Sequence, residues 1–243
     1  MDKLSDDMLQ NVANETVQNI LDEHQITSDL NANQKKKKAT SIKSNLKTTL
    51  DKEISLDPSK TIMSKTNARG IIEYANDYFM EVSGYEEYEL MGQPHNVLRH
   101  PDMPQVVFKL LWERLNKGEN IHAFVKNLAK DGRYYWVLTN FETKYDDEGI
   151  IISHYSRRKT APKNTIYTIE KLYKTLKAIE LKQGLEVALN YFNGLLEEKQ
   201  MTYDDFLLSI LGVDKNTLDA YFMDSSTKSN ETKKRSIFGR LFK

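Results

Sequence analysis

The sequence predicts an α+β domain, in which a five-stranded antiparallel sheet carries short helices on one face. Two short strand-like segments come first, a cluster of short helical segments follows, and three longer strand-like segments close the domain. Antiparallel strands grouped with segregated helices are typical of the α+β class. We expect the sheet and its helices to enclose a space in which a planar ligand can bind.

The first 55 residues are polar, and we expect an N-terminal extension rather than part of the core. Apolar residues at near-helical spacing predict a weak amphipathic helix over 6–24. Four adjacent lysines at 35–38 indicate a solvated basic linker. A second weak helix is predicted over 42–50.

The domain proper, 56–162, begins with two strands and a tight turn. The segment 61–76 reads as strand, turn and strand, with Asn-Ala-Arg-Gly at the turn. Asn76 follows the second strand, where we expect it to cap a helix and to form part of a pocket wall. Gly84 and Gly92 are predicted to end this helix and the next short one.

The stretch "HNVLRHPDMP" (95–104) concentrates hydrogen-bonding groups between two predicted helices. Two interpretations stay open. The first is a turn with helix caps, and the second is a pocket wall that binds a polar, charged ligand.

The strongest helix of this region is predicted over 102–119, because its apolar residues share one face and Gly118 can end it. Three strand-like segments follow at 121–128, 133–143 and 150–157. The sequences "AKDG" and "DDEG" between them are good hairpin turns, which predicts a three-stranded meander.

Beyond residue 162 the pattern becomes helical, and we predict a C-terminal helical module over 163–223. A polar spacer and a basic tail occupy 224–243. In "KKRSIFGRLFK" (233–243) the spacing of apolar and basic residues is typical of a short amphipathic helix on anionic lipid. A frayed terminus and a docking peptide for a partner are the alternatives.

The composition excludes several classes of function. Lys+Arg and Asp+Glu are both 35, so no overall positive charge points to nucleic acid. The absence of cysteine excludes disulfides, thiolate metal sites, cysteine nucleophiles and a flavin–cysteine adduct. No phosphate-binding loop, nucleophile elbow or kinase signature is present, so we do not expect an enzyme. Without a secretory signal or a long apolar segment, we expect a soluble, cytoplasmic protein.

Four stretches, "YANDYFMEVSGY", "GQPHNVLRHPDMP", "VKNLAKDGRYYW" and "SHYSRRK", resemble the PAS sensory domain of the bacterial aerotaxis-receptor (Aer) type. The resemblance covers about 55–162, and "RHPDMP" together with "VKN" and "YYW" is its specific part. It implies a PAS fold that holds FAD without a covalent bond and reports respiratory electron flow.

The chain shows neither a transmembrane segment nor a methyl-accepting coil. It therefore looks more like the stand-alone PAS sensor of a two-protein energy-taxis system (the CetB type). This resemblance implies a membrane chemoreceptor of the methyl-accepting type, or its signalling complex, as the partner. We expect the C-terminal helices to serve as a dimerisation or docking module, in a homodimer. The tail would allow peripheral contact with the inner face of the cytoplasmic membrane.

The candidate cofactor-binding residues lie on elements expected to face the pocket; they are Asn76, Arg99, His100, Asp102, Trp112 and Asn127. The resemblance places Asn76 on an asparagine tied to flavin binding. Arg99 can offer a planar set of five donors to phosphate or ribose oxygens. His100 can donate to a phosphate or stack near the adenine. For Asp102, ligand binding and capping of the following helix are equally open.

Asn127 lies on a central strand, where a buried amide needs a partner. A flavin edge and a sheet-edge hydrogen bond are both open. Trp112 and Trp136 could stack on the ring or belong to the core. Aer-type domains carry tryptophan where this chain has Ile121, which implies a wider slot, weaker flavin binding or a different ligand.

Two further hypotheses concern the ligand. Some PAS domains bind haem through one histidine, so His95, His100, His122 and His154 make haem the second choice. A cofactor-free adaptor, with side chains filling the pocket, is the alternative from a different functional class. The histidines and carboxylates lack metal-ligand spacing, so we expect no metal site.

Overall fold

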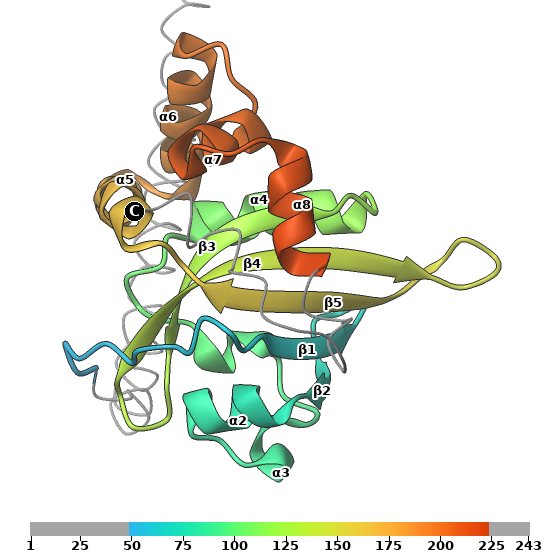
Figure 1. Ribbon diagram of the computed structural model, residues 1–243. Coiled ribbons are helices and arrows are strands. Elements are labelled where there is room, and N and C mark those ends of the chain that lie inside the picture. The colour runs from blue at the N-terminus through green and yellow to red at the C-terminus, as the bar shows by residue number, and fades with distance from the viewer. Residues whose placement is uncertain (1–48, 224–243) are drawn as a thin grey trace, which may run out of the picture. The chain divides into compact units, whose positions relative to one another are not determined.

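The computed structural model describes residues 49–223, and its centre is a five-stranded antiparallel sheet (Figure 1). The strands are β1 Ile62–Asn67, β2 Ile72–Ala75, β3 Ile121–Leu128, β4 Tyr134–Tyr145 and β5 Ile151–Thr160. They are arranged in the order β2-β1-β5-β4-β3, so the first hairpin lies beside the last strand. The predicted α+β class is confirmed. The predictions for 1–48 and 224–243 lie outside the described residues.

Eight helical segments belong to the part of the chain that the structure describes. Those between β2 and β3 are α2 Asp77–Ser83, α3 Glu87–Leu90, the 3-10 turn η1 His95–Leu98 and α4 Gln105–Asn116. Those after β5 are α5 Lys163–Gln183, α6 Leu185–Glu198, α7 Tyr203–Leu211 and α8 Lys215–Met223. Among these described segments, none has the length and apolar character required to cross a lipid bilayer.

The two faces of the sheet carry different helices, because successive side chains of a strand point to opposite sides. Ile121 of β3 packs with Leu111 and Leu115 of α4. The next residue, His122, lies against Phe222 of α8, with ring centroids 5.4 Å apart. We call the α4 side the inner face and the α8 side the outer face.

The helices that follow β5 bind the outer face through tyrosine hydroxyls. Tyr173 of α5 donates to the carbonyl of Phe124 at 2.9 Å. Tyr203 of α7 donates to the carbonyl of His122 at 3.0 Å. Both carbonyls belong to β3, so the C-terminal helices are attached to the strand that forms one edge of the sheet.

The last strand connects the sheet to α8. Lys159 of β5 points to the outer face, where its Nζ donates to the carbonyl of Tyr221 at 2.6 Å. Its neighbour Arg158 points to the inner face and is only 2% exposed. The alternation of the strand therefore places one cation on each side of the sheet.

Helix α4 begins in a way that the sequence did not predict. Its N-cap is Pro104, and the amide of Val106 donates to Oε1 of Glu180, a residue of α5, at 2.8 Å. The interpretation of Asp102 as the N-cap is therefore wrong. Asp102 instead accepts a hydrogen bond from Nζ of Lys126 at 2.7 Å.

Candidate functional site

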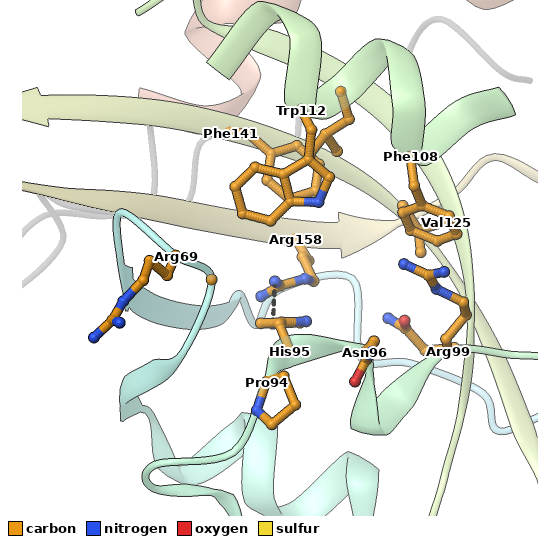
Figure 2. A pocket seen from close by; sticks show the side chains of 13 residues that line it. Arg69, Pro94, His95, Asn96, Arg99, Phe108, Trp112, Val125, Phe141 and Arg158 are labelled. Atoms are coloured by element: carbon orange, nitrogen blue, oxygen red, sulfur yellow. Dashed lines mark hydrogen bonds between the residues drawn. The ribbon is translucent and has the colours of Figure 1, made fainter. Parts of the chain in front are cut away.

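A cavity of about 280 Å³ lies between the inner face of the sheet, η1 and α4 (Figure 2). Its apolar lining consists of Phe108, Leu111, Trp112, Val125 and Phe141. Its polar side chains are Arg69, His95, Asn96, Arg99, Asn127 and Arg158. The volume is close to the lower end of the ~300–1,000 Å³ typical of small-molecule sites. The cavity thus combines an apolar slot with a few polar groups.

The charge of this lining is entirely positive. Arg69 and Arg99 are exposed at the rim, whereas Arg158 is buried. No carboxylate lines the cavity, and within residues 49–223 none of the three guanidinium groups forms a salt bridge. The guanidinium of Arg99 lies over the ring of Phe108, 3.8 Å from its centroid. Such a site favours an anionic ligand with a flat apolar part.

A hydrogen bond between buried Arg158 and partly buried His95 lies in the cavity lining, as the dashed line in Figure 2 shows. Nη2 of Arg158 lies 2.7 Å from Nε2 of His95. Because arginine can only donate, Nε2 is the acceptor and the imidazole is neutral, with its proton on Nδ1. Burial, reinforced by the Arg158 charge, lowers the pKa of His95 to about 3. Burial likewise lowers the pKa of Arg158 to about 10, so its guanidinium stays charged at neutral pH.

Asn127 contributes a buried amide to the cavity lining. The residue is 3% exposed, and its amide lies within reach of the buried hydroxyl of Tyr135. An Asn side chain has two N–H donors, so one of them remains for a ligand. The backbone of Asn127 also pairs with that of Arg99, which connects β3 to the segment after η1.

Three of the six predicted site residues line this cavity: Arg99, Trp112 and Asn127. The indole of Trp112 also meets the ring of His154 edge to face, with centroids 5.7 Å apart. Trp136 lies on the outer face, where it packs against Tyr173. Of the two roles left open for Trp136, stacking on a ligand ring or packing in the core, the structure therefore supports packing in the core.

His100 and Asp102 are not among the lining residues. Arg99 is extended and bridges to β3, so the next side chain points the opposite way. His100 is 4% exposed, packs edge to face on Tyr134 and accepts at Nδ1 from the amide of Asp102. Asp102 is bound to Lys126, as described above. The expectation that both belong to the pocket wall is not met.

Asn76 caps α2 as predicted, but it does not line the cavity. Its Oδ1 accepts from the amides of Phe79 and Met63, at 3.1 and 2.9 Å. Its Nδ2 donates to the carbonyl of Thr61 at 2.9 Å. These bonds connect β1 to α2, so any effect of Asn76 on a ligand is exerted through the fold.

Sequence reasoning missed Arg158 and Phe108, and it considered His95 only as a haem ligand. Period-two alternation in "SHYSRRK" does place His154, Ser156 and Arg158 on one face. That signal was available, but a buried arginine without a carboxylate is uncommon. Ile121, where Aer-type domains carry tryptophan, is 2% exposed and packs under α4 without lining the cavity.

Comparison with known proteins supports the sequence resemblance. Residues 72–154 match the family described as PAS fold. The aerotaxis receptor of Escherichia coli is 46% identical over 118 residues, which are 49% of this chain and 23% of the receptor. The biofilm dispersion protein BdlA of Pseudomonas aeruginosa is 30% identical over 84 residues, 34% of this chain and 20% of that protein. The matches therefore span less than a quarter of the length of these relatives.

Among solved structures, the light state of the blue-light photoreceptor Aureochrome1 LOV covers 49% of this chain and 91% of its own. Its TM-score is 0.40 and its sequence identity 22%. The segment 72–154 therefore matches the PAS fold, and about half of the chain is similar in sequence to a segment of the aerotaxis receptor.

Proposed function

We propose that the PAS domain binds FAD in the inner-face cavity and that the protein is a non-enzymatic redox sensor for aerotaxis or energy taxis. One observation carries the proposal. The cavity joins an apolar slot to three arginines without carboxylate partners and to the buried amide of Asn127. A flavin nucleotide combines a flat ring, an acceptor-rich edge and phosphates, which is the complementary set.

Each group of the lining has a place in this proposal. Phe108 and Trp112 bound the apolar slot, and Asn127 donates from the sheet to a polar ring edge. Arg69 and Arg99, both exposed at the rim, are suited to phosphate oxygens. A bound flavin would supply reversible electron transfer, which these side chains cannot perform themselves.

A change at the bound ligand would be transmitted to the C-terminal helices through β3. The side chain of Asn127 faces the cavity, while its neighbour Lys126 holds Asp102. A change in the hydrogen bonding of Asn127 therefore acts on a strand that also anchors the C-terminal helices. We propose a membrane chemoreceptor of the methyl-accepting type, or its signalling complex, as the partner, supported by the 46% identity to a segment of the aerotaxis receptor.

The visible absorption spectrum of the purified full chain tests the ligand. We expect flavin bands, and mass spectrometry of the heat-released compound should identify FAD. Arg99→Ala should weaken retention of the compound, whereas Arg133→Ala, on the exposed hairpin and paired with Asp131, should not. An equal flavin content in both variants would contradict the role of Arg99.

Two other outcomes of the absorption measurement would contradict FAD binding and favour another function. A Soret band would establish haem, although the one histidine that lines the cavity, His95, already uses Nε2 to accept from Arg158. A colourless protein that retains no added FAD would favour the cofactor-free adaptor.

The homodimer stays a prediction, as does the membrane contact of 233–243, which lies outside the described residues. Light scattering of the full chain measures the first. Sedimentation with acidic vesicles, with and without 233–243, measures the second, and equal pelleting would rule out the membrane role.

A further inference from the structure

Arg158 is a buried cation whose partners are all neutral. It lines the inner end of the cavity and is 2% exposed. Its guanidinium donates to the hydroxyls of Ser64 and Ser156, at 3.0 and 2.9 Å, and to the imidazole of His95 at 2.7 Å. The ring of Phe79 lies 5.7 Å from the guanidinium carbon. None of these groups cancels the charge.

The neighbouring residue Arg157 has a carboxylate partner, which is the usual arrangement for an arginine that is partly removed from water. Arg157 points to the other face of the same strand and forms a salt bridge with Glu142. Removing a cation from water costs far more than burying a neutral group, and a carboxylate commonly compensates for the cost. The chain provides a carboxylate partner for Arg157, whose side chain is 26% exposed, but not for the buried Arg158.

His95 cannot take the place of a carboxylate. Its Nε2 accepts from Arg158, so the ring is neutral, and protonation would set two cations against each other. The buried phenol of Tyr135, the titratable group that interacts with Arg158 besides His95, is kept neutral because burial raises its pKa. Among the described residues, no anion therefore compensates for the charge of Arg158.

The buried part of the cavity lining also holds more donors than acceptors. Of the five N–H groups of a guanidinium, three are used by Ser64, Ser156 and His95. The amide of Asn127, which lines the same cavity, has two N–H donors, and the buried hydroxyl of Tyr135 can accept only one of them. A ligand edge that suits this part accepts hydrogen bonds and carries negative charge.

We propose that Arg158 is the buried anion site of the cavity and receives the oxygen-bearing, negatively charged edge of a planar ligand. The inference deepens the proposed function, because it assigns the ring edge of the ligand to Arg158 and leaves the phosphates to the rim arginines. It also predicts that planar ligands with a negatively charged or oxygen-bearing edge bind even when they carry no phosphate.

Benzoate and benzamide test the site independently of flavin. They share shape and size, but only benzoate is an anion. We expect benzoate to raise the thermal unfolding midpoint of ligand-free full-length protein more than benzamide does. This difference should vanish in Arg158→Met and persist in Arg157→Met, the matched variant on the same strand. Equal shifts for the two compounds in the wild-type protein would overturn the inference.

Riboflavin, which carries the ring without phosphate, links the site to the proposed function. Arg158→Met should weaken its binding about tenfold or more, the usual effect of losing a charge-assisted hydrogen bond. Arg99→Met should weaken FAD binding while leaving riboflavin binding nearly unchanged. Wild-type affinity for riboflavin in Arg158→Met would refute the role of Arg158 but not flavin binding. Failure of the wild-type chain to bind FAD would refute the proposed function and leave the benzoate result to decide on Arg158.

Folding of the variants is controlled by their ligand-free unfolding midpoints. Removing an uncompensated buried charge should leave the midpoint of Arg158→Met equal to or above that of the wild type. A clearly lower midpoint together with an unchanged benzoate shift would show that Arg158 only bridges Ser64 and Ser156, and would overturn the inference. Arg158→Lys, which retains the charge, should keep part of the benzoate shift.

Discussion

Gly70 joins the turn after β1 to the wall of the cavity. Its φ is +79°, and a Cβ at this position would lie 2.9 Å from two ring atoms of Trp112. Only glycine combines this backbone conformation with so close an approach. The turn predicted from Asn-Ala-Arg-Gly therefore also fixes how near the indole can come to the loop.

The first prediction concerns Gly70→Ala. We expect the free energy of unfolding to fall by about 1–3 kcal/mol, from left-handed strain plus the contact with Trp112. Urea denaturation measures the loss, and Trp112 fluorescence reports the ring shift. Gly92→Ala is the matched control, because its φ is +77° but nothing lies within 4 Å of a Cβ there. Equal losses in the two variants would show that the indole contact contributes nothing.

The second prediction concerns pH. The pKa of His95 is lowered from 6.5 to about 3 in the folded protein, chiefly by burial. Between pH 6.5 and 3, His95 binds a proton in the unfolded chain but stays neutral in the folded protein. The free energy of unfolding therefore falls as the pH falls towards 3. The contribution of this group is up to about 1.4 kcal/mol per pH unit. His95→Gln keeps an acceptor for Arg158 and should flatten the dependence.

Urea midpoints between pH 7.5 and 4.5 provide the measurement. Burial also lowers the pKa of His100, His122 and His154, so the variant should retain part of the slope. An unchanged slope in His95→Gln would contradict the neutral, buried imidazole.

At the scale of elements, α4 depends on a helix far along the chain. The amide of Val106 is bound by the carboxylate of Glu180, whose side chain is 3% exposed. A negative group at a helix N-terminus is favoured by the helix dipole as well as by the hydrogen bond. Because α4 carries Phe108 and Trp112, this cap also holds one wall of the cavity.

The third prediction is that Glu180→Ala lowers the free energy of unfolding by about 1–2 kcal/mol. It should also weaken ligand retention, because the start of α4 loosens. Glu113→Ala, which removes an exposed carboxylate from α4 itself, should change stability little. Calorimetry of both variants checks the difference, and similar losses would refute the capping role.

The elements were largely predictable from local patterns. The strand predicted over 121–128 coincides with β3, because its hydrophobic run ends at turn residues on both sides. The cap at Asn76 likewise follows from short-range chemistry. The opposite directions of Arg99 and His100 were not predictable, because they depend on how η1 ends and on a bridge to β3 28 positions later. The cap from Glu180 is equally non-local.

At the scale of the whole described unit, the C-terminal helices serve as part of the core. The outer face of β3 and β4 presents Phe124, Trp136 and Leu138, each less than 5% exposed. Trp136 is covered by Tyr173 of α5. The sequence predicted a module over 163–223 but could not show which surface it covers, because an amphipathic stripe does not specify its partner.

The fourth prediction follows from this packing. A chain ending at residue 162 would expose a continuous apolar surface on the sheet, and we expect it to aggregate or to unfold at lower urea concentration. A chain ending at 223 retains α5 to α8 and should behave like the full chain. Light scattering and urea denaturation compare the two, and a stable monomer ending at 162 would show that the helices are dispensable.

The alternation of β5 has a consequence for how far a binding event must travel. Arg158 lies in the cavity and Lys159 holds the carbonyl of Tyr221, so a single peptide unit separates the two contacts. A small roll of the strand about its own axis would move both side chains at once, in opposite senses. The route from the cavity to the final turn of α8 is therefore as short as the thickness of one strand.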